Sequence, residues 1–242
     1  MPGLKEDLKF VLMRNEIMKN NIKSTIRKFH LAFRLLLTYP WLIKFFWYES
    51  RIVSRLEKDY HAYVTSISTA DMAISIRLAA LLAFICEEIQ PKVIYDLGSG
   101  FSSFVLHLYA KSCLTPPTVY SVDGDAAWLE ASQKFLRERQ LETEETQFYT
   151  FDNFCRADIK KGDLVLLDIF HTEDGSRAAV LEKLNQWIKN STLIVVDDMS
   201  KPNYRQTVYT WAKKMNITCV DLLPFTQDVY GRFSSLLFKS GK

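Results

Sequence analysis

The sequence predicts an α/β fold in which a doubly wound, mostly parallel sheet follows a helical N-terminal region. From Leu4 to Tyr63, apolar residues recur at a mixed spacing of three and four, which is typical of helices. After Pro91, short β-branched runs alternate with helical stretches over about 140 residues, a pattern typical of parallel strands covered on both faces. Acidic residues follow or close most of these runs, and such sheets bind their ligands at the carboxyl ends of the strands.

The N-terminal region contains the most apolar segment of the chain, residues 29–48 (FHLAFRLLLTYPWLIKFFWY). Arg34, Pro40 and Lys44 interrupt this segment, so it fits poorly to a membrane-spanning helix, which needs about 20 apolar residues. Two interpretations stay open. The segment forms helices, broken near Pro40, that cover the body or pair with a second copy in a homodimer. Alternatively, it lies in a membrane interface, which the nearby basic and aromatic residues favour.

A further helix is expected from about Thr69 to Glu88, capped at its start by Ser68 or Thr69 and ended by Gln90-Pro91. The runs that predict strands follow in the order KVIYDLGSG, TVYSVDGD, TQFYTFDN, GDLVLLDIF, STLIVVDD, ITCVDLLPF and FSSLLFK.

Charge and cysteine content exclude several classes of function. The net charge is +3, with 31 Lys and Arg against 28 Asp and Glu, and the basic excess lies in the first 60 residues. The body after them is slightly acidic, which argues against a polynucleotide substrate because its phosphates require Lys and Arg. The four cysteines lie far apart without a CxxC motif, which excludes structural zinc. The start, MPGLKEDLKF, lacks the apolar core of a secretory signal, so we expect reduced thiols and a cytoplasmic protein, peripheral to a membrane if residues 29–48 bind one.

The most specific motif is a glycine turn between an expected strand and an expected helix, residues 93–106. Gly98 and Gly100 follow Asp96, and glycine lets a backbone approach a ligand closely. One strand later, Asp123 ends the run VYSVD, where its carboxylate would accept two hydrogen bonds from a ribose diol. Together, the turn and the acidic residue indicate a nucleoside cofactor.

In this order, the runs DLGSGFSS, VYSVDGD, FDN, LVLLDIF, LIVVDD and the closing pair CVDLLPF and RFSSLLF resemble the class I S-adenosylmethionine-dependent methyltransferases. The resemblance covers about residues 68 to 239, and it departs from the family at Ser102, where a third glycine is usual. It implies a Rossmann-like, seven-stranded sheet closed by an antiparallel C-terminal hairpin. It also implies a methyltransferase domain at residues 68–242 behind a helical arm at residues 1–67.

The resemblance further implies the residues that bind S-adenosylmethionine: Asp96, Gly98, Ser99 and Gly100 at the methionine end, Asp123 at the ribose hydroxyls, and Asp152 with Asn153 at the adenine edge. Trp128, on the helix after Asp123, would cover the adenine face or serve as a core aromatic residue.

Three further carboxylates would meet at adjacent strand ends, Asp168 after the fourth run and Asp197 with Asp198 after the fifth. Their spacing resembles the metal-dependent O-methyltransferases of the catechol and caffeoyl-coenzyme A type, which implies Mg²⁺ or another divalent metal on these three residues. In the alternative interpretation, Asp168 orients cofactor or substrate and Asp198 caps the following turn. His171, three residues after Asp168, is the candidate general base.

The expected function is methyl transfer from S-adenosylmethionine to a hydroxyl of a small molecule or glycan, such as a sugar, a phenol or a lipid-linked glycan. Two alternatives from other classes stay open. One is an NAD-binding oxidoreductase, although the turn lacks the third glycine of that fingerprint. The other is a non-catalytic binding module that keeps the fold, with the helical arm as its interaction surface.

Overall fold

The computed structural model describes residue 33 and residues 39–169 and 177–239. Contacts divide the chain into two compact units, residues 1–42 and residues 43–242, and the second unit holds the sheet. The expected boundary at residues 67 and 68 differs from this division and stays a prediction.

The sheet has seven strands in the order β3-β2-β1-β4-β5-β7-β6. The strands are β1 Val93–Leu97, β2 Thr118–Asp123, β3 Thr146–Thr150, β4 Gly162–Leu167, β5 Ile188–Val196, β6 Thr218–Asp221 and β7 Ser235–Phe238. The first five strands in sequence pair in parallel, and β7 lies antiparallel between β5 and β6. The predicted mostly parallel sheet with an antiparallel C-terminal hairpin is therefore confirmed.

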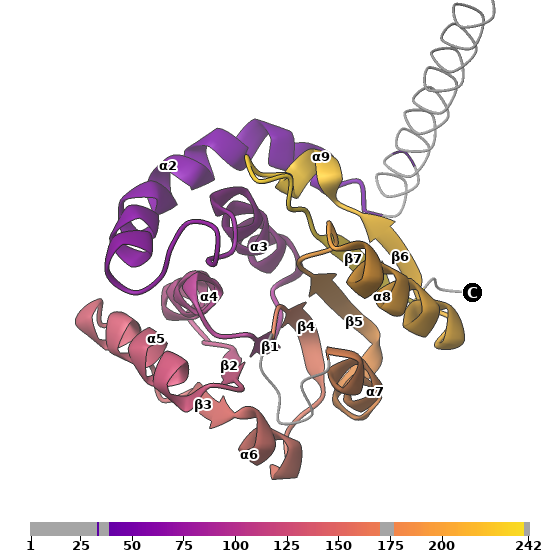
Figure 1. The fold of residues 1–242 in the computed structure, drawn as a ribbon. Helices are drawn as coiled ribbons and strands as arrows, with labels where there is room; N and C mark the ends of the chain where they lie inside the picture. The colour runs from indigo at the N-terminus through magenta and orange to yellow at the C-terminus, as the bar shows by residue number, and fades with distance from the viewer. Residues whose placement is uncertain (1–32, 34–38, 170–176, 240–242) are drawn as a thin grey trace, which may run out of the picture. The chain divides into compact units, whose positions relative to one another are not determined.

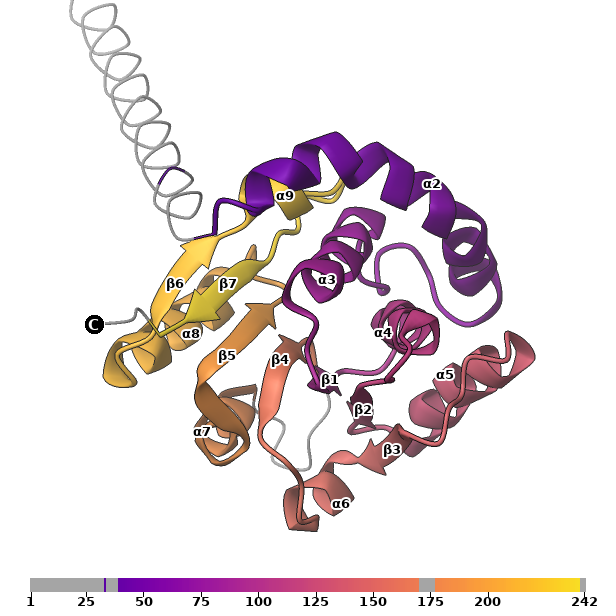
Figure 2. The same ribbon diagram turned by 180° about the vertical axis from the view of Figure 1, so that it is seen from behind.

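Helices cover both faces of this sheet (Figures 1 and 2). The helices are α2 Leu42–Ser66, α3 Ile76–Ile89, α4 Phe101–Ser112, α5 Ala126–Glu138, α6 Phe151–Arg156, α7 Arg177–Trp187, α8 Pro202–Lys214 and α9 Leu223–Thr226. On one face lie α3, α4 and α5, and on the other lie α6, α7 and α8. Strands β1 to β3 are added toward one edge of the sheet and β4 and β5 toward the other, so the strand order reverses between β1 and β4. The carboxyl ends of these two parallel strands form the crevice in which a doubly wound fold binds its ligand.

Strand alternation decides which side chains face the site. Tyr95 and Leu97 of β1 belong to the apolar core cluster that also contains Val180 of α7 and Val208 of α8. Successive residues of a strand point to opposite faces, so Asp96 faces the other layer, where it contacts α4. This is why a carboxylate lies buried within an otherwise apolar strand.

Helix α3 begins later than the sequence predicts. Its N-cap is Ser75, whose hydroxyl oxygen accepts a hydrogen bond from the backbone N–H of Leu78 at 3.1 Å. The predicted start near Thr69 is wrong because residues 69–73 form a separate turn, in which the N–H groups of Met72 and Ala73 donate to the carbonyl of Thr69. The connection between α2 and α3 is consequently a loop, and it runs close to the β6–β7 connection.

Helix α2 packs its apolar side against several helices of one layer. Phe45 lies 5.5 Å from the ring of Phe84 on α3 and 6.1 Å from Phe225 on α9, measured between ring centroids. The opposite side leaves Trp47 exposed to solvent, to 81%. Among the helices that the structure describes, none combines the length and the apolar character needed to cross a bilayer. Residues 29–32 and 34–38 of the apolar segment lie outside the described part, and membrane contact and dimerisation through the segment stay predictions.

Two aromatic residues of α2, two positions apart, should respond differently to truncation. Phe45→Ala is expected to lower the free energy of unfolding by about 3–5 kcal/mol, because it removes a fully buried ring from the contacts with α3 and α9. Trp47→Ala, the control, is expected to change it by no more than about 0.5 kcal/mol. Urea denaturation followed by circular dichroism measures both variants, and equal losses would contradict this packing of α2.

Candidate active site

The β1–α4 turn forms the floor of the candidate site. The backbone N–H groups of Gly98 and Ser99 both donate to the carbonyl of Val122 on β2, at 2.8 and 3.1 Å. Gly98 has φ +117°, and a Cβ atom there would lie 2.6 Å from the carbonyl carbon of Asp168. Only glycine fits this conformation and this approach of two backbones, so the turn is held between the ends of β2 and β4.

Asp96 lies fully buried beneath this turn. Its Oδ2 atom accepts hydrogen bonds from the hydroxyls of Ser103 on α4 and Ser121 on β2. Burial raises the pKa of Asp96 to about 7, while the hydrogen bonds from the serines oppose this shift. Its Oδ1 atom is buried and accepts no hydrogen bond from the residues that the structure describes. A buried acceptor of this kind fits a ligand that brings its own donor, such as the α-ammonium group of a methionine moiety.

Asp123 ends β2 beside the turn. Its Oδ1 accepts the backbone N–H of Asp125 at 3.0 Å, and its Oδ2 accepts the hydroxyl of Ser99 at 3.2 Å. Burial is the main cause of the raised pKa of Asp123. Because each carboxylate oxygen can accept more than one hydrogen bond, Asp123 keeps the capacity to bind a ribose diol.

Trp128 is anchored to the turn. Asp125 caps α5 by accepting hydrogen bonds from the N–H groups of Ala127 and Trp128, which fixes the first turn of that helix. The indole N–H of Trp128 then donates to the carbonyl of Ser99 at 2.7 Å, and the side chain is only partly buried. This contact favours the predicted role at the cofactor site over a role in the core.

Asp152 and Asn153 occupy the first turn of α6, directly after β3. Thr150 of β3 is in register with Asp123 of β2, so both residues lie at the same edge of the sheet as Asp123. Asp152 is half-buried and Asn153 is exposed. Their predicted role at the adenine edge remains a prediction.

The other half of the site follows β4 and β5. The backbone N–H of Asp168 donates to the carbonyl of Leu97 at 2.7 Å, and that of Asp197 donates to Leu167 at 3.0 Å. Asp197 is buried, its Oδ1 accepts the hydroxyl of Ser234 at 2.7 Å, and its pKa is raised by burial and by the charge of Asp198. Asp198 adopts φ +60° and forms an ion pair with Lys201 at 2.6 Å.

These carboxylates do not form the predicted metal site in the part of the chain that the structure describes, where no group of three His, Cys, Asp or Glu side chains could hold a metal ion. The positive charge near them comes from the chain itself, because Lys201 pairs with Asp198 and the Arg232 guanidinium lowers the pKa of Asp197. A divalent metal on Asp168, Asp197 and Asp198 is therefore not confirmed and stays a prediction. His171, the predicted base, lies outside the described residues.

No pattern in the sequence predicts a role for Arg232. Its guanidinium pairs with Asp228 at 2.7 Å and donates to the carbonyls of Asp71 and Ala70 at 2.6 and 3.0 Å. It thereby joins the β6–β7 connection to the loop between α2 and α3. Because 160 residues separate these segments, only the folded chain reveals the contact.

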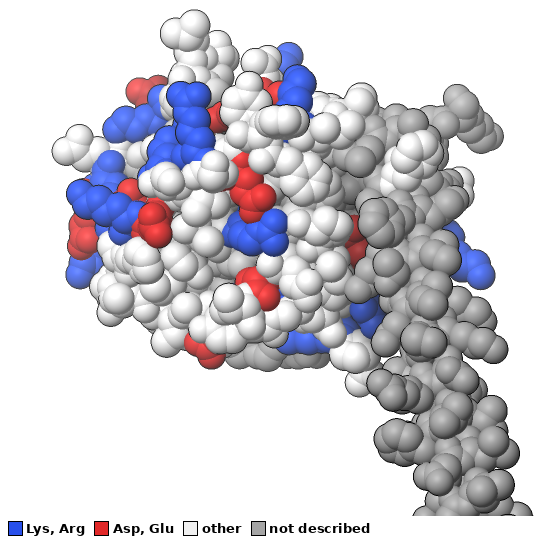
Figure 3. Space-filling view, turned by 90° about the horizontal axis from the view of Figure 1, so that it is seen from above, with Lys and Arg blue, Asp and Glu red and all other residues white. Residues whose placement is uncertain are grey.

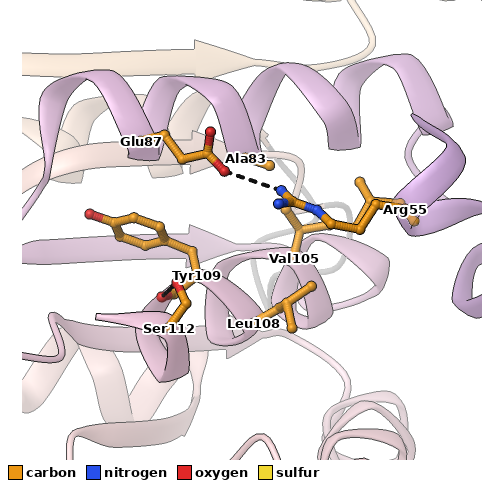
Figure 4. A pocket seen from close by; sticks show the side chains of 8 residues that line it. Arg55, Ala83, Glu87, Val105, Leu108, Tyr109 and Ser112 are labelled. Carbon is orange, nitrogen blue, oxygen red and sulfur yellow. Dashed lines mark hydrogen bonds and ion pairs between the residues drawn. The ribbon is translucent and has the colours of Figure 1, made fainter. Parts of the chain in front are cut away.

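A separate pocket lies between α2, α3 and α4 (Figure 4). It is lined by Arg55, Leu56, Ala83, Glu87, Val105, Leu108, Tyr109 and Ser112. Two of these lining residues, Arg55 and Glu87, form an ion pair 3.1 Å long. These residues come from the later parts of α3 and α4, whereas the glycine turn adjoins the start of α4, so this pocket is distinct from the candidate site.

Surface charge on the face above α2 and α9 is mixed. Figure 3 shows Lys and Arg interspersed with Asp and Glu over the described residues of this face, with much uncharged surface between them.

Comparison with solved structures identifies the fold. A putative O-methyltransferase from Klebsiella pneumoniae superimposes with a TM-score of 0.59 at 14% identity, over 78% of this chain and 90% of that chain. The S-adenosylhomocysteine-bound methyltransferase PaMTH1 of Podospora anserina gives 0.57 at 13% identity, over 76% and 88%. The O-methyltransferase TomG of Streptomyces achromogenes, in complex with S-adenosylmethionine, gives 0.55 at 15% identity, over 78% and 90%. No family model and no curated protein matches the sequence. The chain has the Rossmann-like fold of the class I methyltransferases.

The two glycines of the turn should differ in their tolerance of a methyl group. Gly98→Ala is expected to lower the free energy of unfolding by about 2–5 kcal/mol, because the new Cβ meets the backbone of Asp168 at a strained φ. Gly100→Ala places its Cβ 3.4 Å from the nearest atom and is expected to cost less than about 1 kcal/mol. Urea denaturation compares the two, and similar losses would refute the close approach at Gly98.

Proposed function

We propose that this chain is an S-adenosylmethionine-dependent methyltransferase that acts on a hydroxyl of a small molecule or glycan. The observation that carries the proposal is the buried Oδ1 of Asp96 beneath the Gly98 turn, which accepts no hydrogen bond from the described residues, with Asp123 at the end of the next strand. This set offers one acceptor for an ammonium group and one carboxylate for a ribose. The fold shared with proteins solved with S-adenosylmethionine or S-adenosylhomocysteine supports it.

Each part of the site has a proposed task. Asp96, Gly98, Ser99 and Gly100 hold the methionine end, and Asp123 binds the ribose hydroxyls. Trp128, Asp152 and Asn153 border the adenine. When bound, the cofactor supplies a methyl group on a sulfonium, which is already activated for displacement.

The chain contributes placement and proton removal. Methyl transfer requires the acceptor oxygen to lie in line with the methyl group, in a site that excludes water. The backbone hydrogen bond from Asp168 to Leu97 holds Asp168 next to the turn. We assign its carboxylate to the orientation of the acceptor hydroxyl. We assign proton removal to Asp168 and His171. No step is assigned to a metal, because Lys201 already pairs with Asp198.

The alternatives differ in their expected ligands. A dinucleotide-binding oxidoreductase is disfavoured by the antiparallel β7 between β5 and β6, an arrangement not expected in that fold. A non-catalytic module with this fold would bind the cofactor without transferring its methyl group. A peripheral membrane position and a cytoplasmic location stay part of the proposal, as does homodimer formation.

Calorimetric titration of the full chain with S-adenosylmethionine and with S-adenosylhomocysteine tests the proposal. We expect micromolar dissociation constants for both, unchanged by Mg²⁺ or by EDTA, because the described cofactor residues involve no metal. Absence of binding under both conditions would refute the cofactor assignment.

The metal is tested separately. Mn²⁺ added to the cofactor complex is expected to give no bound signal in electron paramagnetic resonance, in the wild type and in Asp168→Ala alike. A bound Mn²⁺ signal that Asp168→Ala abolishes would restore the metal site predicted from the spacing, while leaving the cofactor assignment intact.

Cofactor affinity should depend on pH through Asp96. Its pKa is raised to about 7, so it carries a proton below that pH, and only the ionised form pairs with an ammonium group. The dissociation constant of S-adenosylhomocysteine is therefore expected to rise below pH 7, approaching about tenfold per pH unit. Titrations between pH 5.5 and 8.5 measure it. Asp96→Asn should weaken binding and flatten the profile, whereas a flat profile in the wild type would exclude Asp96 as the ammonium partner.

A further inference from the structure

The connection between β6 and β7 contains a tight turn at residues 228–232. The Oδ1 atom of Asp228 accepts hydrogen bonds from the backbone N–H groups of Tyr230 and Arg232, at 3.0 and 2.9 Å. Its Oδ2 atom accepts a hydrogen bond from the Arg232 guanidinium at 2.7 Å. Gly231 adopts φ +76°, and its N–H donates to the carbonyl of Asp228 at 3.1 Å. The turn is therefore held in one conformation by its own hydrogen bonds.

Two apolar side chains project from this turn into solvent. Val229 is 94% exposed and Tyr230 is 57% exposed. The side chain of Val229 takes no part in the hydrogen bonds that form the turn, which come from Asp228, Arg232 and the backbone. Surface turns favour Gly, Pro, Asn, Asp and Ser, so the geometry of the turn does not explain these two apolar residues.

A third exposed apolar side chain lies on the loop that this turn contacts. The Arg232 guanidinium donates to the carbonyls of residues 70–71, at 3.0 and 2.6 Å, and it lies 5.3 Å from the centroid of the Tyr230 ring. Met72, the next residue of the loop, is 66% exposed. We call Met72, Val229 and Tyr230 the apolar rim. Single exposed apolar residues are common, but a cluster of them indicates an interaction site.

The apolar rim lies at the edge of the sheet that holds the candidate site. Strand β7 begins in register with Val196, the last residue of β5, so the turn precedes β7 at the carboxyl end of β5. Burial alone would lower the pKa of Arg232, yet that pKa is raised. The ion pair with Asp228 and the charges of Asp197 and Asp198 cause the rise, so the guanidinium lies near the acceptor half of the site.

The apolar rim also lies near the glycine turn. The ring of Tyr60 on α2 lies 5.0 Å from that of Phe101, the first residue of α4. Burial is the main cause of the raised pKa of Tyr60, and the neighbouring Tyr230 contributes to it. Tyr60 thus connects Tyr230 to the start of α4, and the rim lies near both halves of the candidate site.

We propose that the apolar rim binds a hydrocarbon chain of the acceptor, so that the acceptor is an amphipathic molecule whose hydroxyl enters the site while its chain covers Met72, Val229 and Tyr230. This inference rests on the proposed function and narrows its acceptor class. A free sugar would leave the rim in water, whereas a chain removes apolar surface from water, which is favourable in proportion to the buried area. A bilayer surface and a second copy of the chain are the competing occupants.

The test measures how binding depends on chain length. The probes are the straight-chain 1-alkanols from ethanol to 1-octanol, which keep one hydroxyl and differ only in their chain, added to the full protein saturated with S-adenosylhomocysteine. We expect the dissociation constant, measured by ligand-observed NMR, to fall about two- to fourfold for each added methylene, where fourfold corresponds to a fully buried group.

The double variant Met72→Ser, Val229→Ser removes two side chains of the rim and leaves the hydrogen bonds of the turn in place. It should reduce the dependence to less than about 1.5-fold per methylene and leave the affinity for ethanol unchanged. The matched control is Leu114→Ser, which removes an exposed leucine between α4 and β2, at the opposite edge of the sheet, and should behave as the wild type. Thermal unfolding monitors whether each variant is folded. If the double variant fails to fold, Val229→Ser alone supplies the test.

An unchanged chain-length dependence in the double variant would overturn the proposal, as would the absence of this dependence in the wild type. Two further measurements test the competing occupants: sedimentation with vesicles of phosphatidylcholine and phosphatidylglycerol, and size-exclusion chromatography. A loss of vesicle binding or of a dimer in the double variant, without a change in the alkanol series, would assign the rim to a bilayer or to a second copy instead. Failure of the wild type to bind S-adenosylhomocysteine would overturn the proposed function, and the alkanol series on the free protein would still test the rim.

Discussion

The approach of the β1–α4 turn to the end of β4 is the constraint on which the candidate site depends. A Cβ atom on Gly98 would lie within 3 Å of the Asp168 backbone, so the two strand ends are locked at a distance that only glycine permits. Asp96 and Asp123 are placed on one side of this contact, and Asp168 and Asp197 on the other. The geometry of both halves is therefore set by backbone packing, and the side chains contribute their chemistry to a frame that is already rigid.

Burial of carboxylates is the electrostatic cost of this arrangement. The pKa values of Asp96, Asp123 and Asp197 are all raised, chiefly because water is excluded from them. Hydrogen bonds from hydroxyl groups partly offset this cost, including those from Ser103 to Asp96 and from Ser234 to Asp197. A hydroxyl donor leaves the negative charge in place, so the cofactor end of the site is suited to a ligand that brings a positive charge.

The strands could be predicted from the sequence because most are apolar runs that end in a polar residue, as in DLVLLD at residues 163–168. The start of α3 could not, because Ser68, Thr69 and Ser75 are all competent N-caps and only the turn at residues 69–73 decides among them. The glycine turn and Asp123 were predicted from the sequence because they lie close together in it, in one motif. Arg232 was not, because the carbonyls that it contacts, those of Asp71 and Ala70, lie much earlier in the chain.

The two halves of the candidate site differ in which groups compensate the charge of their carboxylates. The spacing of residues in the sequence does not reveal this difference, so spacing alone suggested a metal. Asp168, Asp197 and Asp198 do follow adjacent strands, as the sequence indicates. Spacing does not reveal which cations reach them, and here Lys201 pairs with Asp198 while Arg232, held by Asp228, lies near enough to lower the pKa of Asp197. A divalent ion would have to displace these contacts. The charge of Asp198 is thus compensated within the chain, whereas the Oδ1 atom of Asp96 is buried without a hydrogen bond from the described residues.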